Sequence, residues 1–181
     1  MSALPESVLA FWFDEIAPAQ WWKVDPAFDA EVGRRFGTLL ERARCCELFA
    51  WRASPQGRLA EVLVLDQFSR NVHRGTPGAF AADALALALA QEAVAAGFDL
   101  ALPPERRAFF YMPYMHSESP AIHAVAEPLM RERAPAHTHE FELRHKAIVD
   151  RFGRYPHRNA ILGRASTPEE EAFLTQPGSS F

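Results

Sequence analysis

Apolar positions along the chain recur at the spacing of α-helices rather than of strands. The clearest series is Phe28, Val32, Phe36, Leu39, Leu40 and Ala43. This i, i+4, i+8, i+11 spacing marks one face of an amphipathic helix. We find no convincing alternation of apolar and polar residues, which a half-buried strand would require. The pattern predicts an all-α fold.

Five pairs of a capping residue followed by proline predict where helices start. They are Asp25-Pro26, Ser54-Pro55, Thr76-Pro77, Ser119-Pro120 and Thr167-Pro168. In each pair the first side chain can accept a hydrogen bond from the free N–H groups of the first turn, and proline suits the first helical position. Glu170 completes a capping box in the last pair. The chain is therefore expected to be a series of helices joined by short turns.

Glycine and proline predict where other helices end. Pro113 is expected to end or kink a helix that starts near Pro103 or Pro104, leaving residues 114–119 irregular. Further helices are expected over residues 59–71, 79–96, 121–133 and 138–152, with Gly97 and Gly153 as stops. A length of 181 residues suits one core, so residues 1–181 are predicted to form a single all-helical domain.

Two helices carry polar side chains where apolar ones are expected. The buried stripe of Leu59, Val62 and Leu63 continues onto Asp66 and then Arg70. An unpaired charge there would be costly, so these two side chains need each other or other partners.

In the second of these helices, a histidine lies on the apolar face. His145 takes the i+4 place in the series Phe141, Ile148 and Phe152, so it is expected to face inward. A single inward histidine is more often a core residue bonded to a backbone carbonyl than a catalytic one.

Overall charge and composition narrow the possible partners. The net charge of −4 gives no general attraction to nucleic acid. The apolar stretch 79–97 contains Asp83, Gln91 and Glu92, so a packed helix explains it better than a membrane span. Adjacent Cys45 and Cys46 indicate reduced thiols. The apolar run of residues 8–13 has no cationic segment before it and is too short for the hydrophobic region of a signal peptide. We expect a cytoplasmic protein without nucleic-acid or membrane partners.

The segment 141–164 has a local charge opposite to that of the whole chain. It carries six Lys or Arg against two acids, Glu142 and Asp150, an excess of 6 − 2 = 4. Guanidinium groups match carboxylate and phosphate oxygens, and a helix starting near Asn159 could add backbone donors. The alternative is an internal network in which Asp66, Glu118 and Asp150 neutralise the arginines; the residues do not decide between the two.

Three polar segments, residues 66–74, 114–119 and 151–164, could converge on one cleft. The candidate catalytic residues are Asp66, His116, Glu118 and His145. The candidate ligand-binding residues are Arg70, Asn71, His73, Arg74, Arg154, His157, Arg158 and Arg164.

No motif indicates a metal or a cofactor. His116 and Glu118 are two positions apart, as are His137 and His139, and neither pair has the i, i+4 spacing of a helical zinc site. The sequence has no Gly-x-Ser-x-Gly elbow, phosphate loop or dinucleotide fingerprint.

Several long motifs together resemble one known family. They are FWF, LDQFSRNVHRG, YMPYMHSES, RFGRYPHRNAILGR, STPEEEAFL and the terminal GSSF. In this order they resemble the bacterial family catalogued as domain of unknown function 924, over nearly the whole chain. The resemblance implies an all-helical fold similar to tetratricopeptide-like superhelices of antiparallel hairpins, and it supplies no established reaction. YMPYMHSES departs slightly from the versions of that motif in the family.

Three functions follow, in order of preference. The first is a binding module with an Arg/His-lined pocket for a small anionic ligand or a peptide carboxylate. The second is a structural or protein-interaction scaffold with the motifs as internal ion pairs. The third is an enzyme that uses a histidine and a carboxylate on an anionic substrate. The sequence does not indicate the oligomeric state.

Overall fold

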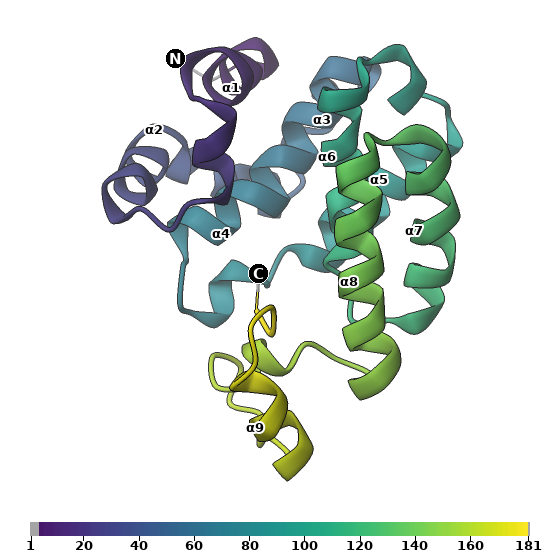
Figure 1. Cartoon of the computed structure of the whole chain (residues 1–181). Coiled ribbons are helices and arrows are strands. Elements are labelled where there is room, and N and C mark those ends of the chain that lie inside the picture. The colour runs from purple at the N-terminus through teal and green to yellow at the C-terminus, as the bar shows by residue number, and fades with distance from the viewer. Residues whose placement is uncertain (1–3, 181) are drawn as a thin grey trace.

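The computed structural model describes residues 4–180, and this part of the chain is helical without a strand, as predicted (Figure 1). The α-helices are α1 (Pro5–Ala10), α2 (Pro26–Arg44), α3 (Pro55–Leu63), α4 (Ser69–Val72), α5 (Asp83–Ala95), α6 (Pro104–Met115), α7 (Pro120–Arg133), α8 (Ala136–Phe152) and α9 (Pro168–Leu174). Short 3₁₀ turns, including Pro18–Trp22 and Pro156–Arg158, connect some of them.

Three of the five predicted caps form as expected. The Asp25 carboxylate accepts from the backbone N–H groups of Ala27 and Phe28, and the Ser54 hydroxyl accepts from that of Gly57. Thr167 and Glu170 form the complete capping box at the start of α9. These bonds satisfy N–H groups that the first helical turn leaves without partners.

The other two caps differ from the expectation. The Thr76 hydroxyl instead donates to the carbonyl of His73, so Pro77–Ala79 is only a 3₁₀ turn and α5 starts later, at Asp83. Helix α7 does start at Pro120, but without a side-chain bond from Ser119.

Two predicted helix bounds are wrong. Helix α6 does not end at Pro113 but continues to Met115, because the proline removes a single backbone bond two residues before the helix ends. Residues 116–119 lie outside any helix, as predicted. No α-helix starts near Asn159; a 3₁₀ turn, Pro156–Arg158, precedes it, and turns follow it. The extra backbone donors expected at that position are therefore not supplied by a helix N-terminus.

A π-helical turn, Val64–Phe68, joins α3 to α4 and makes one continuous helical rod. All five residues of this turn are buried, including Asp66 and Gln67. A π turn widens a helix locally and is frequent at functional sites. It places a carboxylate in the middle of the rod, facing the protein interior.

Helix α5 packs between α3 and α6 through small side chains. Ala86, Ala90 and Ala93 are fully buried, so the helices can approach closely. The stretch Pro77–Ala95 has the length and apolar composition of a membrane span, with a mean hydropathy of 1.3. Of this apolar window, 33% is buried inside the protein.

The C-terminal segment, residues 153–180, turns back under the helices, and Figure 1 shows its yellow end lying near the middle of the molecule. Gly153, at φ 70°, ends α8 and allows the reversal. Tyr155 then fixes the segment: its hydroxyl donates to the carbonyl of Met115 at 2.5 Å, and its backbone N–H donates to Glu118. This attachment brings the basic residues of the segment to α5 and α6.

The two serine–proline pairs provide a matched test of the capping argument. Replacing Ser54→Ala removes the bond to Gly57, and we expect the free energy of unfolding to fall by about 1 kcal/mol. Ser119→Ala removes no side-chain cap, and we expect a change within about 0.5 kcal/mol. Urea denaturation of both variants measures the difference, and equal losses would contradict the assignment.

Candidate functional site

A cavity of about 570 Å³, here called the central cavity, lies between the helices and the C-terminal segment. Residues from α4, α6, α8, the turn after Pro18 and the C-terminal segment line it. Seven of the predicted site residues face it: Arg70, Asn71, Arg74, His116, His145, His157 and Arg158. The structure therefore brings together side chains that are up to 88 positions apart in the sequence (158 − 70).

Asp66 and His116 form a hydrogen-bonded pair at the base of the central cavity. The distance between Asp66 Oδ1 and His116 Nδ1 is 2.7 Å, and the Asp66 side chain is 1% exposed while that of His116 is 15% exposed. Burial alone would raise the pKa of Asp66, but the charge of Arg70 and the bond from His116 lower it overall. Burial and Arg70 lower the pKa of His116.

These shifts determine where the protons lie near neutral pH. Asp66 is an anion and can only accept, so Nδ1 of neutral His116 carries the proton and donates it to Asp66. The second ring nitrogen, Nε2, then has its lone pair available. No described residue forms a hydrogen bond with it.

Arg70 and Arg158 share the carboxylate of Asp83. Arg70 donates from Nη1 to Asp83 Oδ1 at 2.9 Å and from Nη2 to Oδ2 at 3.1 Å, and Arg158 Nη1 donates to Oδ2 at 3.3 Å. Arg70 Nη1 also donates to the carbonyl of Asp66. Two guanidinium groups from distant segments are thus held beside each other by one carboxylate at the start of α5.

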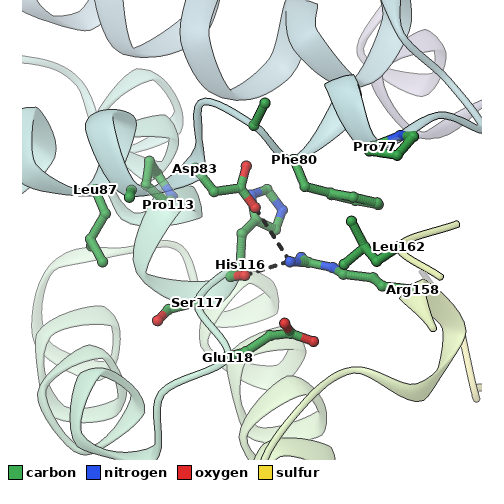
Figure 2. Close-up of a pocket in the computed structure, with 12 residues that line it drawn as sticks. Pro77, Phe80, Asp83, Leu87, Pro113, His116, Ser117, Glu118, Arg158 and Leu162 are labelled. Atoms are coloured by element: carbon green, nitrogen blue, oxygen red, sulfur yellow. Dashed lines mark hydrogen bonds and ion pairs between the residues drawn. The ribbon is translucent and has the colours of Figure 1, made fainter. Parts of the chain in front are cut away.

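Figure 2 shows Arg158 entering a second, smaller cavity of about 390 Å³, here called the side cavity, between Asp83 and the carbonyl of His116. The guanidinium lies against the rings of Phe80 and Tyr155, 4.5 and 4.7 Å from their centroids. Cation–π contacts of this kind stabilise a buried guanidinium. His116 and Arg158 line both cavities.

Both arginines keep donors that their protein bonds do not use. A guanidinium has five N–H donors. Arg70 makes three hydrogen bonds and Arg158 makes two, to Asp83 and to the His116 carbonyl. Nε of Arg158 is buried without a hydrogen-bond partner among residues 4–180. A buried charged donor without a partner favours a ligand or water that can accept from it.

His145 and His157 add buried imidazoles to the same cavity. His145 Nδ1 donates to the carbonyl of Phe141, the backbone bond expected for an inward histidine. Burial lowers the pKa of His145 to about 3 and that of His157 to about 4. Both rings are neutral near neutral pH, so they add hydrogen-bonding groups and no positive charge.

The exposed lining of the central cavity mixes apolar and polar side chains. Its exposed large apolar side chains, here called the rim, are Trp22, Val24 and Phe141, and Lys23, Arg74 and His137 are also exposed. Phe141 was expected in the buried stripe of its helix, but it is 45% exposed because the stripe faces the cavity at this point rather than another helix. The cavity therefore combines exposed apolar side chains at its rim with buried polar groups such as His145 and Arg158.

The other predicted site residues lie outside the central cavity. Arg154 is paired with Glu170, and Arg164 with Glu118, by two bonds each at 2.7 or 2.8 Å. Glu118 lines the side cavity. His73 lies beside Glu41 of α2 and lines neither cavity. Arg154 and Arg164 thus hold the C-terminal segment in place, as the internal-network alternative describes.

Sequence reasoning missed two parts of the site. Asp83 was noted only as a polar break in an alanine-rich helix, although its position at the helix start and its charge could have identified it as a partner for arginines. The second is a buried pair, His123 Nδ1 and Glu142 Oε1, 2.7 Å apart between α7 and α8. His123 Nε2 contacts the Ser117 carbonyl and the Tyr155 hydroxyl, so this pair supports the segment that carries His116.

Metal-binding geometry does not appear in the described part of the chain. Among residues 4–180 no three His, Cys, Asp or Glu side chains are grouped in a way that could hold a metal ion.

Comparisons with known proteins identify the family without naming a reaction. A family model described as "Bacterial protein of unknown function (DUF924)" matches residues 8–178. A solved structure from Agrobacterium tumefaciens, the protein of unknown function ATU0120, is 38% identical and has a TM-score of 0.89 over 94% of this chain and 96% of that one. No curated protein matches. The chain belongs to this bacterial family, DUF924.

Proposed function

We propose that the protein binds a small anionic organic molecule in the central cavity. The observation that carries this proposal is the convergence of Arg70, His116 and Arg158 on one cavity of about 570 Å³. This volume lies within the range of small-molecule sites, which combine apolar walls with a few convergent polar groups. A peptide carboxylate is the wider alternative within the same proposal.

The groups lining the cavity indicate the chemistry of the ligand. The unused N–H donors of Arg70 and Arg158 suit carboxylate or phosphate oxygens. Because Asp66 and Asp83 already balance these two charges, recognition depends on hydrogen bonds rather than on a strong positive field. The exposed rim suits an apolar body next to the anionic group.

A scaffold role is the second candidate, and the pairs Arg154–Glu170 and Arg164–Glu118 favour it. These pairs are internal connections, but they lie outside the central cavity and leave it open. We therefore rank binding first. The tetratricopeptide-like superhelix, the single domain and the cytoplasmic location remain predictions of the sequence.

Calorimetric titration with benzoate, phenyl phosphate and benzyl alcohol tests the proposal. We expect the two anions to bind and the alcohol to bind at least about tenfold more weakly, because it cannot accept from the guanidinium donors as an anion does. Equal affinity for benzoate and benzyl alcohol, or no binding of any of the three, would contradict the proposal.

A matched pair of variants locates the binding site. Arg158→Lys keeps the charge but removes the planar fork and Nε, and we expect benzoate affinity to fall by about tenfold or more. Arg154→Lys makes the same change on the same segment outside the cavity, and we expect affinity within about threefold of the original. Circular dichroism verifies that both variants are folded.

The neutral histidines predict a pH dependence of stability. The pKa of His145 is lowered to about 3, so between about pH 6.5 and this value the unfolded chain binds a proton that the folded chain does not. The free energy of unfolding should then decrease as pH falls below about 6.5, by up to about 1.4 kcal/mol per pH unit for this residue.

Urea denaturation between about pH 7 and pH 5 measures that slope. His145→Gln should reduce the slope because the buried imidazole is gone. His137→Gln, at an exposed position of the same helix, serves as the control and should leave the slope unchanged. An equal slope in His145→Gln and the original protein would show that His145 is not held neutral.

A further inference from the structure

The pair of Asp66 and His116 has a geometry that binding alone does not require. A buried carboxylate orients the ring through Nδ1 at 2.7 Å, and His116 lines both the central and the side cavity. In this tautomer Nε2 is the basic nitrogen, and it has no protein partner among residues 4–180. A histidine oriented in this way is equipped to accept a proton.

We propose that His116 is a general base and that the protein hydrolyses small acyl esters in the central cavity. This inference rests on the proposed function, because the ester must bind where the anionic ligand binds. Asp66 is a positioning residue: it holds the tautomer and stabilises the imidazolium that forms.

Water is the nucleophile that this site can activate. The hydroxyl that follows His116 in sequence, that of Ser117, lines the side cavity, and its oxygen accepts from the backbone N–H of Ser119. No hydroxyl or thiol among the described residues forms a hydrogen bond with Nε2. A covalent acyl-enzyme therefore has no side chain on which to form.

The proposed reaction balances without a further reactant. His116 Nε2 takes a proton from water as the water oxygen attacks the ester carbonyl carbon. The carbonyl oxygen becomes an oxyanion, for which the unused N–H groups of Arg70 and Arg158 are the available donors. When the C–O bond to the leaving group breaks, the proton passes from His116 to the leaving oxygen. The products are a carboxylic acid and an alcohol.

Asp66 and His116 are both held by helical elements, as suits a pair of catalytic groups. Asp66 lies on the π turn of the rod from α3 to α4, and His116 is the residue that ends α6. Both elements belong to the packed helical body, so the distance between carboxylate and ring is fixed by regular structure. Catalytic groups held on such elements need little reorganisation when a substrate binds.

Hydrolysis of p-nitrophenyl acetate by the full chain tests this inference. We expect a rate above that of buffer, and a decrease in kcat/KM of about a hundredfold or more in His116→Gln. His139→Gln, which lines neither cavity and contacts Glu127, is the control and should keep the original rate. Equal rates in His116→Gln and the original protein, or no hydrolysis above buffer, would overturn the inference.

The pH profile of the original protein gives a second readout that needs no variant. Because the pKa of His116 is lowered, kcat/KM should reach half its maximum below about pH 6.5, the pKa of a free imidazole. A profile that rises through about pH 6.5 with half its maximum there would be that of unperturbed surface histidines and would contradict the assignment.

Benzoate titration of the original protein separates the two proposals. If the original protein binds benzoate and His116→Gln has lost hydrolysis, both proposals hold. If benzoate binds and hydrolysis is the same in both proteins, the general base is wrong and the binding function stands. If benzoate does not bind although hydrolysis depends on His116, the anion preference is wrong.

Discussion

Asp83 holds together the polar part of the central cavity. Its carboxylate accepts from Arg70 and from Arg158, which approach from α4 and from the C-terminal segment. Two like charges held at the same carboxylate repel each other by a few kcal/mol at an effective dielectric constant of about 20. A shared carboxylate offsets that repulsion and attaches the segment to the helical body. Without this carboxylate, the repulsion between the two guanidinium groups would not be offset at this point.

The same network explains why the imidazoles of the cavity are neutral. Asp66 would favour a charged His116, but burial and the nearby charge of Arg70 outweigh it and lower the pKa of the ring. Arg70 in turn keeps Asp66 ionised. One cation thus fixes the state of both members of the pair, an anionic carboxylate and a neutral base. Replacing Arg70 by an uncharged residue would therefore change the pKa of His116 although His116 itself is not replaced.

The sequence predicted those parts of the site that lie on regular helices. The apolar period of residues 59–71 placed Asp66 and Arg70 inside, and that of residues 138–152 placed His145 inside, because a buried face repeats with the helix. The C-terminal segment has no such period. The sequence therefore could not show which of its arginines pair with carboxylates and which line the cavity. Arg154 and Arg158 are four positions apart, yet the first pairs with Glu170 and only the second reaches Asp83.

Two further features of the structure could not be predicted from the local spacing of apolar residues. The π turn at Val64–Phe68 inserts an extra residue into the helical register, which a constant period of 3.6 cannot reveal. Phe141 is exposed because it lines a cavity that the C-terminal segment and α8 form together. Both depend on tertiary contacts, and tertiary contacts override local propensity.

The residues of the site come from two kinds of element, packed helices and irregular segments. Asp66 and His116 belong to the helical body, whereas the exposed Trp22 and Val24 and the buried Arg158 lie outside the α-helices. Turns tolerate change more readily than packed helices do. Substitutions in the turns would alter the shape and polarity of the entrance while leaving the carboxylate–imidazole pair in place.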